Sequence, residues 1–301
     1  MAETLPARPP AIGAPVPQAR RRRRANLPGT ATKYGFLVLF AVMALYPVLL
    51  VISTSVRDPL DTTADPFDLF SSVDLGNFHD AWTIGGFGGY LWNTILVSVP
   101  SVIGIVALST MAGYAFARLA FPGRNALFFL FILGLMIPFM SIMIPLYFQL
   151  RDMQLLDTWA AVILPLIAGA SGTGLPLGIF LMRAFFQDLP RELGEAAKVD
   201  GTTEFGLFRH VMLPLALPGA GVLAVFSFIQ AWNVFVLPLI YLQSEDKRTL
   251  ATGLYAFTTG RSTETEYLAA GTILMVVPVL AFFLLFQRQF IRGLTAGAVK
   301  G

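Results

Sequence analysis

The chain has 301 residues, of which 55% are hydrophobic and 13% are charged, about half the charged share that is typical of soluble domains. A single soluble core would leave much of that apolar surface in water, so the composition argues against an ordinary soluble globular protein. Cysteine is absent, which excludes disulfides, thiolate catalysis and cysteine-bound metals. The two histidines, His79 and His210, are too few to form a metal cluster.

Six stretches of the chain carry neither a charged residue nor a histidine for at least 21 residues. A helix needs about 20 such residues to cross a bilayer, at about 1.5 Å of rise per residue. Open strands cannot satisfy their backbone groups in hydrocarbon, so the sequence predicts an all-α polytopic membrane protein with six transmembrane helices. The predicted spans are about 34–56, 90–117, 125–149, 158–182, 211–241 and 267–287, with kinks expected at Pro47, Pro100 and Pro138.

The basic residues predict the orientation of these spans. With a cytoplasmic N-terminus, the inside segments hold 16 of the 21 Lys and Arg and the outside loops hold five, so the positive-inside rule places both termini in the cytoplasm. Residues 1–32 are expected to be a disordered basic tail, in which the arginine run at 20–24 anchors the topology near anionic lipid and does not bind nucleic acid. Residues 33–292 form the predicted membrane domain, and 293–301 a short cytoplasmic tail.

Two outside loops have recognisable composition. The first, 57–80, holds six aspartates without the spacing of a calcium loop, and we expect it to be a solvated connector. The second, 245–266, is expected to hold a short helix at 249–257.

The spans contain no ionisable group away from their ends. Carriers coupled to protons or sodium usually keep such groups, at a cost of about 2.5–3.5 kcal/mol each on insertion scales. The chain also lacks a phosphate-binding GxxxxGK[ST] loop, a nucleophile elbow and an intramembrane protease pair. We therefore expect a transport subunit that is not an enzyme and binds no cofactor. A gradient-driven transporter with sites built from backbone carbonyls is the less favoured alternative.

The loop at 183–210 is the longest inside segment after the N-terminal tail. Asp188 can cap a helix of about three turns, with Pro190 in its first turn and Gly201 at a left-handed position after its end. One side of this helix is apolar and small, with Leu189, Leu193, Ala196 and Ala197. Such a face suits a groove on a partner protein, or it packs on the protein's own spans.

The same loop carries the residues of a known signature. Glu195, Ala196 and Ala197, then Gly201, then Val211 to Pro214 resemble the EAA-x3-G-x9-I-x-LP signature of ABC importer permeases, with Val211 where Ile is usual. Segments 91–101, 112–124, 231–240 and 290–301 are similar to the carbohydrate-importing permeases of the maltose-transporter type, and to the second permease subunit within it.

The resemblance implies a type I ABC importer permease fold in the cell membrane, with four kinds of partner. These are a paralogous permease in a heterodimer, a cytoplasmic ATPase dimer that binds ATP and Mg, an external solute-binding protein and a sugar. The residues implied to couple this chain to the ATPase are Glu195, Ala196, Ala197, Gly201, Leu213 and Pro214.

Polar and aromatic residues inside spans are candidates for lining the path, since they would be costly against lipid. The candidates are Asn93, Tyr147, Gln230, Trp232 and Asn233, with Trp92 and Gln149 beside them. Hydrogen bonding between helices is an equally good account of each. Because the path lacks charge, we expect a neutral sugar or oligosaccharide. The alternative solute is glycerol 3-phosphate or another polyol-type compound.

Overall fold

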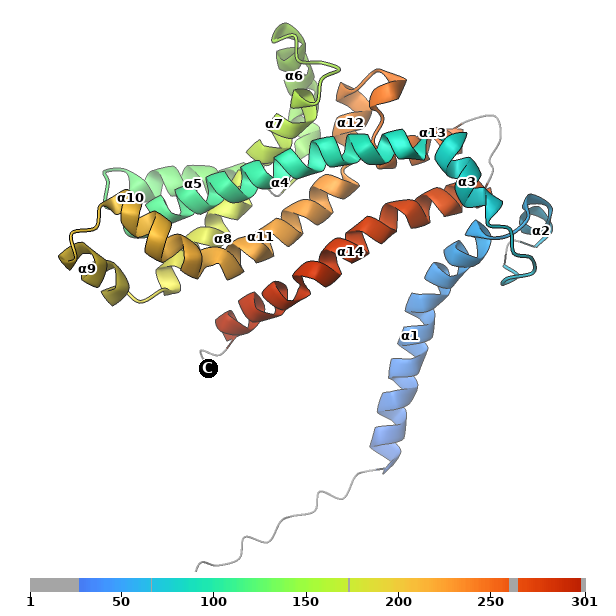
Figure 1. Ribbon diagram of the computed structural model, residues 1–301, viewed down its shortest axis with the longest axis horizontal. Helices are drawn as coiled ribbons and strands as arrows, with labels where there is room; N and C mark the ends of the chain where they lie inside the picture. The colour runs from blue at the N-terminus through green and yellow to red at the C-terminus, as the bar shows by residue number, and fades with distance from the viewer. Residues whose placement is uncertain (1–26, 66, 173, 260–264, 299–301) are drawn as a thin grey trace, which may run out of the picture. The chain divides into compact units, whose positions relative to one another are not determined.

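The computed structural model describes residues 27–65, 67–172, 174–259 and 265–298. Within these ranges every regular element is a helix (Figure 1). In chain order they are α1 (Leu27–Ser55), α2 (Pro59–Ala64), α3 (Gly76–Thr83), α4 (Phe87–Arg118), α5 (Arg124–Gly134), α6 (Phe139–Asp152), α7 (Ala160–Ala168), α8 (Leu175–Asp188), α9 (Glu192–Val199), α10 (Glu204–Leu207), the π-helix η1 (Phe208–Met212), α11 (Leu213–Asn233), α12 (Val236–Tyr241), the 3-10 helix η2 (Glu245–Lys247), α13 (Leu250–Thr259) and α14 (Thr265–Ala298).

The chain divides into two units, residues 1–48 and 49–301. The described part of the first unit belongs to α1, which begins at Leu27. The last six residues of the tail that was expected to be disordered are therefore helical, and residues 1–26 lie outside the described part. At the other end, α14 continues to Ala298, so most of the expected C-terminal tail is helical too.

Within the described part of the chain, four helices are long and apolar enough to cross a membrane: Thr32–Ser55, Phe87–Arg118, Glu204–Asn233 and Thr265–Gln287. They lie at the first, second, fifth and sixth predicted spans. The helix pair α5 and α6 can supply a fifth crossing, although the two helices are bent by 96°. The count of six spans and the side of each terminus stay predictions.

Breaks interrupt the third, fourth and fifth predicted spans. Residues 135–138 separate α5 from α6, and Pro138 disfavours helical backbone in the residue before it. Between α7 and α8, Gly169, Gly172 and Gly174 have φ of 103°, 92° and 78°, a left-handed region that suits glycine. Of the three expected kinks, only Pro138 lies at a break. Pro47 and Pro100 lie inside helices that continue past them.

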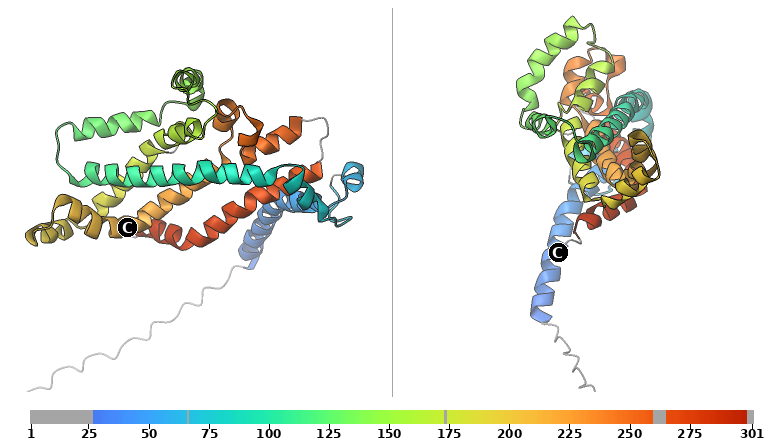
Figure 2. Two further views of the ribbon diagram at one scale, coloured as in Figure 1. Left: turned by 45° about the horizontal axis from the view of Figure 1, so that its top comes forward. Right: turned by 90° about the vertical axis from the view of Figure 1, so that its left-hand side faces the viewer.

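In the second unit α4 packs against α8 and α11, and α11 packs against α14 (Figures 1 and 2). Glycine allows the close contact of α4 with α8. A Cβ on Gly113 would lie 2.6 Å from the Cβ of Met182, and one on Gly178 would lie 2.1 Å from the Oγ of Ser109. Small residues at such crossings let backbones approach closely in membrane proteins.

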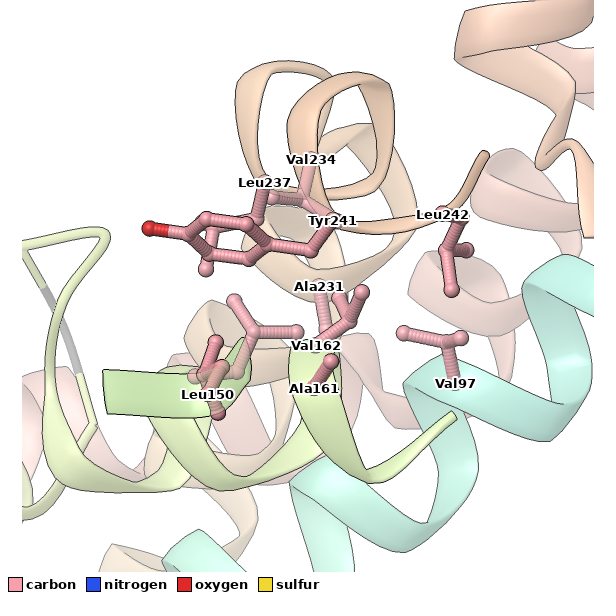
Figure 3. Close-up of a cluster of buried hydrophobic side chains, with 10 residues drawn as sticks. Val97, Leu150, Ala161, Val162, Ala231, Val234, Leu237, Tyr241 and Leu242 are labelled. Carbon is pink, nitrogen blue, oxygen red and sulfur yellow. The ribbon is translucent and has the colours of Figure 1, made fainter. Parts of the chain in front are cut away.

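A buried cluster holds the broken helices together (Figure 3). Tyr241 of α12 lies at its centre, fully buried, and its hydroxyl donates to the carbonyl of Met143 in α6 at 3.1 Å. The cluster joins side chains of α4, α6, α7, α11 and α12 or the loops beside them: Val97, Leu150, Ala161, Val162, Leu166, Ala231, Val234, Leu237, Tyr241 and Leu242.

The first loop is mostly exposed, as expected of a solvated connector, and it is also folded around a buried arginine. Arg57 is 1% exposed. Its guanidinium donates to the backbone carbonyls of Asp61, Asp65 and Asp68 at 2.7–2.9 Å. The buried guanidinium thereby joins three backbone carbonyls of the turns around α2.

Candidate functional site

The signature loop contains a helix that is shorter than expected. α8 extends through Asp188, and the chain becomes extended at Leu189 because Pro190 disfavours helical backbone there. The helix α9 begins only at Glu192, after Arg191, and has eight residues. The prediction that Asp188 caps a helix of three turns is therefore wrong.

Gly201 has φ of 78°, as the sequence predicted. The amide of Gly201 donates to the carbonyl of Lys198 at 3.0 Å, and the amide of Thr202 donates to the carbonyl of Ala197 at 3.1 Å. These two bonds form a Schellman motif, which satisfies carbonyls at the end of a helix. The glycine of the signature therefore fixes the end of α9.

The surface of α9 has an exposed part and a packed part. Glu195 and Ala196 are exposed, and Val199 is 88% exposed. Ala197 and Leu189 are half-buried against the core cluster around Tyr114. Within the described residues the Glu195 carboxylate has no hydrogen bond or ion pair, so it is available to a partner. Part of the apolar face thus packs on the protein itself, and the rest is open.

The second half of the signature begins α11 with a widened turn. The amide of Leu213 donates to the carbonyl of Phe208, five residues back, so η1 has π geometry. Pro214 has no N–H, and in an α-helix its ring would clash with the carbonyl of His210. The wider π turn accommodates that ring, and such turns are frequent at functional sites.

A second candidate site is a cavity of about 560 Å³ where the three helix breaks meet. Its lining includes the polar side chains of Gln230 and Asn233 from α11. The remaining lining residues are Leu135, Ile137, Pro138, Phe139, Ala170, Ser171, Gly172, Ile229, Val234, Phe235, Val236 and Leu237. No side chain in this lining carries a formal charge.

Two polar atoms at the cavity lack partners among the residues that the structure describes. The amide nitrogen of Gln230 donates to the carbonyl of Ser171, while the amide oxygen of Gln230 and the hydroxyl of Ser171 are buried without hydrogen bonds. Buried polar atoms usually have a partner, from the protein or from a bound molecule. The Asn233 amide nitrogen donates to the carbonyl of Ile229 at 2.7 Å, and the side chain is exposed. The cavity can therefore hydrogen bond an uncharged solute.

The structure places the other path candidates away from this cavity. Asn93 is buried and donates to the carbonyls of Asp246 and Arg248 at 2.7 and 2.9 Å. Trp232 donates to the carbonyl of Met275 at 3.0 Å. Tyr147 accepts a bond from Gln243 at 3.3 Å. Each bond joins separate segments, which is the alternative account, and their role in the path stays a prediction. Trp92 is exposed, and Gln149 lines a separate cavity of about 400 Å³ between α6 and α7.

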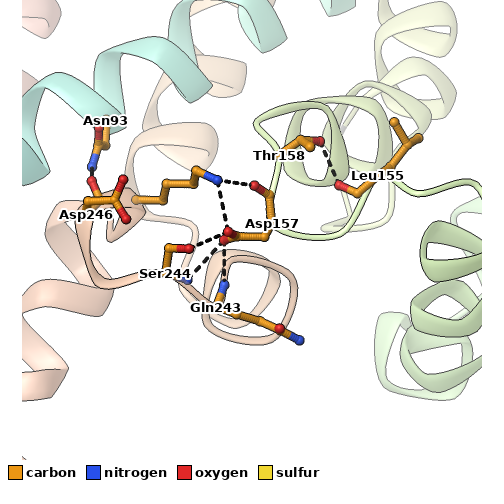
Figure 4. A network of polar contacts seen from close by, with 8 residues as sticks. Asn93, Leu155, Asp157, Thr158, Gln243, Ser244 and Asp246 are labelled. Carbon is orange, nitrogen blue, oxygen red and sulfur yellow. Dashed lines mark hydrogen bonds and ion pairs between the residues drawn. The ribbon is translucent and has the colours of Figure 1, made fainter.

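The segment 242–249 is fixed from two sides (Figure 4). Asp157, between α6 and α7, accepts bonds from the amides of Gln243 and Ser244 at 2.9 and 3.0 Å and from Lys247 Nζ at 2.9 Å. The hydrogen bonds from Ser244 and then from Lys247 lower the pKa of Asp157 well below its ordinary value. On the other side, Asn93 of α4 holds the carbonyls of Asp246 and Arg248.

Sequence reasoning missed that the lining comes from helix breaks. The signals were present, since Pro138 and the glycines at 169, 172 and 174 mark two of the breaks. Pro238 marks the third, because its ring nitrogen cannot donate to the carbonyl of Val234.

Comparisons with known proteins agree with the fold and the signature. Residues 105–295 match the family model of the binding-protein-dependent transport system inner membrane component. The arabinooligosaccharides transport system permease protein AraQ of Halalkalibacterium halodurans is 38% identical over 269 residues, which cover 87% of this chain and 93% of that protein. The diacetylchitobiose uptake system permease protein NgcG of Streptomyces coelicolor is 33% identical over 272 residues, covering 90% and 89%.

A solved structure shares the fold. It is a crystal structure of a bacterial ABC transporter involved in the import of the acidic polysaccharide alginate, with a TM-score of 0.76 and 22% identity, covering 88% of this chain and 97% of that chain. With the family match over most of the second unit, this confirms the resemblance drawn from the signature. The chain belongs to the binding-protein-dependent transport system inner membrane component family and is a multi-pass membrane permease.

Proposed function

We propose that the chain is the membrane-spanning permease subunit of an ATP-driven ABC importer for a neutral sugar or oligosaccharide, which an external solute-binding protein delivers. The observation that carries the proposal is the signature that runs from α9 to the start of α11, with Glu195 exposed and the end of α9 fixed by Gly201. The family description names a binding protein, and the relatives AraQ and NgcG are named for saccharide uptake.

A partner ATPase supplies the energy in this proposal. The sequence has no phosphate-binding loop of its own, so ATP and Mg bind to the partner and not to this chain. The Glu195 carboxylate would accept charge-assisted hydrogen bonds from the ATPase surface, each about 1.5–3 kcal/mol when desolvated. The small, exposed side chain of Ala196 permits close approach of the ATPase, and the small side chain of Ala197 permits close packing on the core cluster. A paralogous permease completes the membrane part as a heterodimer.

The cavity at the helix breaks suits a neutral saccharide. Sugar hydroxyls can donate to the free oxygen of Gln230 and exchange bonds with Ser171 and Asn233. Phe139 and Phe235 are half-buried in the lining and offer apolar surface to a sugar ring. An anionic solute would favour a basic side chain, and this lining has none.

The proposal is tested with the chain purified together with its partner permease, ATPase and binding protein, and reconstituted into liposomes. Labelled arabinotriose, diacetylchitobiose, trehalose and glycerol 3-phosphate are offered in turn, and uptake and ATP hydrolysis are measured. We expect a neutral saccharide to stimulate hydrolysis and to accumulate. Uptake of glycerol 3-phosphate alone would favour the polyol alternative. Uptake that persists without the ATPase and collapses with an ionophore would favour a gradient-driven transporter.

A further inference from the structure

We propose that Tyr114 and Arg118, on one face of α4, are positioning residues that tie the segments on either side of α9 to α4. Arg118 holds the end of α8 and the turn before α9, and Tyr114 holds Glu204 beyond its other end. Through these ties a movement of α9 is passed directly into a membrane-spanning helix. Residues four apart share a helix face, so one face of α4 reaches the segments just before and just after the signature helix. This inference rests on the proposed coupling of α9 to an ATPase.

The first tie lies where the chain leaves α8. Arg118 donates from Nε and Nη2 to the carbonyl of Phe186 at 2.9 and 2.6 Å, and from Nη2 to the carbonyl of Leu189 at 2.5 Å. In a continuing helix the carbonyl of Phe186 would accept from residue 190. Residue 190 is proline, which has no N–H. The guanidinium of α4 replaces that donor and also places a positive charge at the negative end of α8.

The second tie lies beyond the other end of α9. The Tyr114 hydroxyl donates to Oε2 of Glu204 at 3.4 Å, and Oε1 of Glu204 is paired with Lys198 in the last turn of α9. The Tyr114 ring is fixed between two aromatic rings, with centroids 5.5 Å from Phe186 and 5.0 Å from Phe208. A chain of three polar side chains therefore runs from α9 to α4.

Direct packing is limited where these ties cross. A cavity of about 130 Å³ lies between α4 and α9, lined by Tyr114 and Arg118 on one side and by Glu195 and Lys198 on the other. Empty space transmits no van der Waals contact, so the polar ties bridge this gap. Met212 of η1 lines the same cavity, and its Cε lies 3.5 Å from the position of a Cβ built on Gly194.

The first test compares Arg118→Gln with Arg124→Gln in the complete reconstituted transporter. Arg124 is the first residue of α5, six residues after Arg118 at the end of α4. Among the described residues its guanidinium donates to the carbonyl of Leu119, five residues before it, and not to the signature loop. Uptake and ATP hydrolysis are measured in the same liposomes, using the saccharide that the wild type transports. For R118Q we expect the solute moved per ATP to fall about tenfold, because hydrogen bonds from a charged group are lost. The amount of ATPase that is purified with the permease should be the same as for the wild type. R124Q should keep the wild-type ratio.

A second variant separates a tie from a mere helix cap. Pro190→Ala restores an N–H that can donate to the carbonyl of Phe186. We expect R118Q to lower the thermal midpoint in detergent and R118Q/P190A to restore it. The solute moved per ATP should stay low in the double variant, because the link to α4 is still missing. Recovery of the ratio would overturn the proposal, since Arg118 would then act only as a cap. Tyr114→Phe, which removes one oxygen, should lower the ratio about threefold, because the bond that is lost to the Glu204 carboxylate is long, at 3.4 Å.

The outcomes distinguish this inference from the proposed function. A wild-type ratio in R118Q and Y114F, in an assembly that transports normally, would overturn the inference alone. If R118Q is not recovered from membranes, Arg118→Lys takes its place, because lysine keeps the charge but not the fork of donors. A wild-type ratio in R118K would likewise overturn the first tie. A wild-type assembly without ATP-driven uptake would overturn the proposed function itself.

Discussion

Replacing Gly201 with alanine should weaken coupling without removing the protein from the membrane. The φ of this residue is 78°, and no atom lies within 4 Å of the place where a Cβ would be added. The cost is therefore one of backbone conformation alone, about 1–2 kcal/mol for a residue with a side chain. A change of that size shifts an equilibrium by about 5- to 30-fold. The equilibrium affected here is between α9 with its end closed by the Schellman motif and α9 with that end open.

A partner that binds only the closed form sees its apparent affinity fall with the closed fraction, and therefore by that factor at most. We expect Gly201→Ala to lower ATP-driven uptake at subsaturating ATPase, by at most about 5- to 30-fold. Gly201→Asn should have a smaller effect, because asparagine tolerates left-handed backbone better than alanine does. Uptake is measured in the reconstituted transporter and normalised to the protein present, and hydrogen exchange at the amides of 201 and 202 reports the opening of the turn.

Gly123→Ala is the matched control. Gly123 has φ of 77° and open space around it, and it precedes α5 away from the signature loop. The same backbone strain should leave uptake per inserted protein unchanged there. If Gly201→Ala raises the exchange at 202 but transports like the wild type, then the closed end of α9 has no part in coupling.

Four further predictions concern single side chains. Glu195→Lys should abolish uptake at normal membrane abundance, because it reverses the charge offered to the ATPase, and normal uptake in a transport assay would remove this role. Gly194→Ala should stabilise α9 by up to about 1 kcal/mol, since the added Cβ meets only ordinary contacts at 3.5 Å or more; slower hydrogen exchange in α9 checks it, and faster exchange would refute it. Asn233→Ala should raise the KM for the solute about three- to tenfold, because one hydrogen bond is lost. The control Gln287→Ala removes an amide that donates within its own turn of α14 and should leave the KM unchanged. Equal KM values for both variants would contradict the cavity assignment. Asp157→Asn should lower the thermal midpoint in detergent by about 2–4 °C at neutral pH. Because the pKa of Asp157 in the folded protein is lowered from its ordinary 3.8, this difference between variant and wild type should persist down to about pH 4 and shrink as the pH falls further. A difference independent of pH would refute the ionic role of Asp157.

Local features of the sequence predicted much of this structure. A left-handed backbone was predicted for Gly201 because this glycine directly follows the predicted helix. Its φ of 78° confirms the prediction. The short helix expected at 249–257 is α13, Leu250–Thr259. In both cases the signal lies within a few residues of its effect.

Features that depend on distant residues were not predictable in this way. Arg118 lies 68 residues from Phe186, and Asn93 lies 153 residues from Asp246. Their partners are backbone carbonyls, which every residue has, so no residue type in the sequence marks the acceptor. The spans misled for a related reason, since an uncharged run fixes hydrophobicity but not helix continuity. The breaks that separate α5 from α6 and α7 from α8 follow from single prolines and glycines inside such uncharged runs.

The most direct test of the central claim measures uptake in liposomes that hold this chain alone, the chain with its partner permease, or the full assembly with ATPase and binding protein. Each is supplied with ATP, with an imposed ion gradient, or with both. We expect accumulation of the saccharide only in the full assembly and only with ATP, and its loss when Glu195 is replaced by lysine. Accumulation by this chain without the ATPase, driven by the ion gradient, would contradict the account.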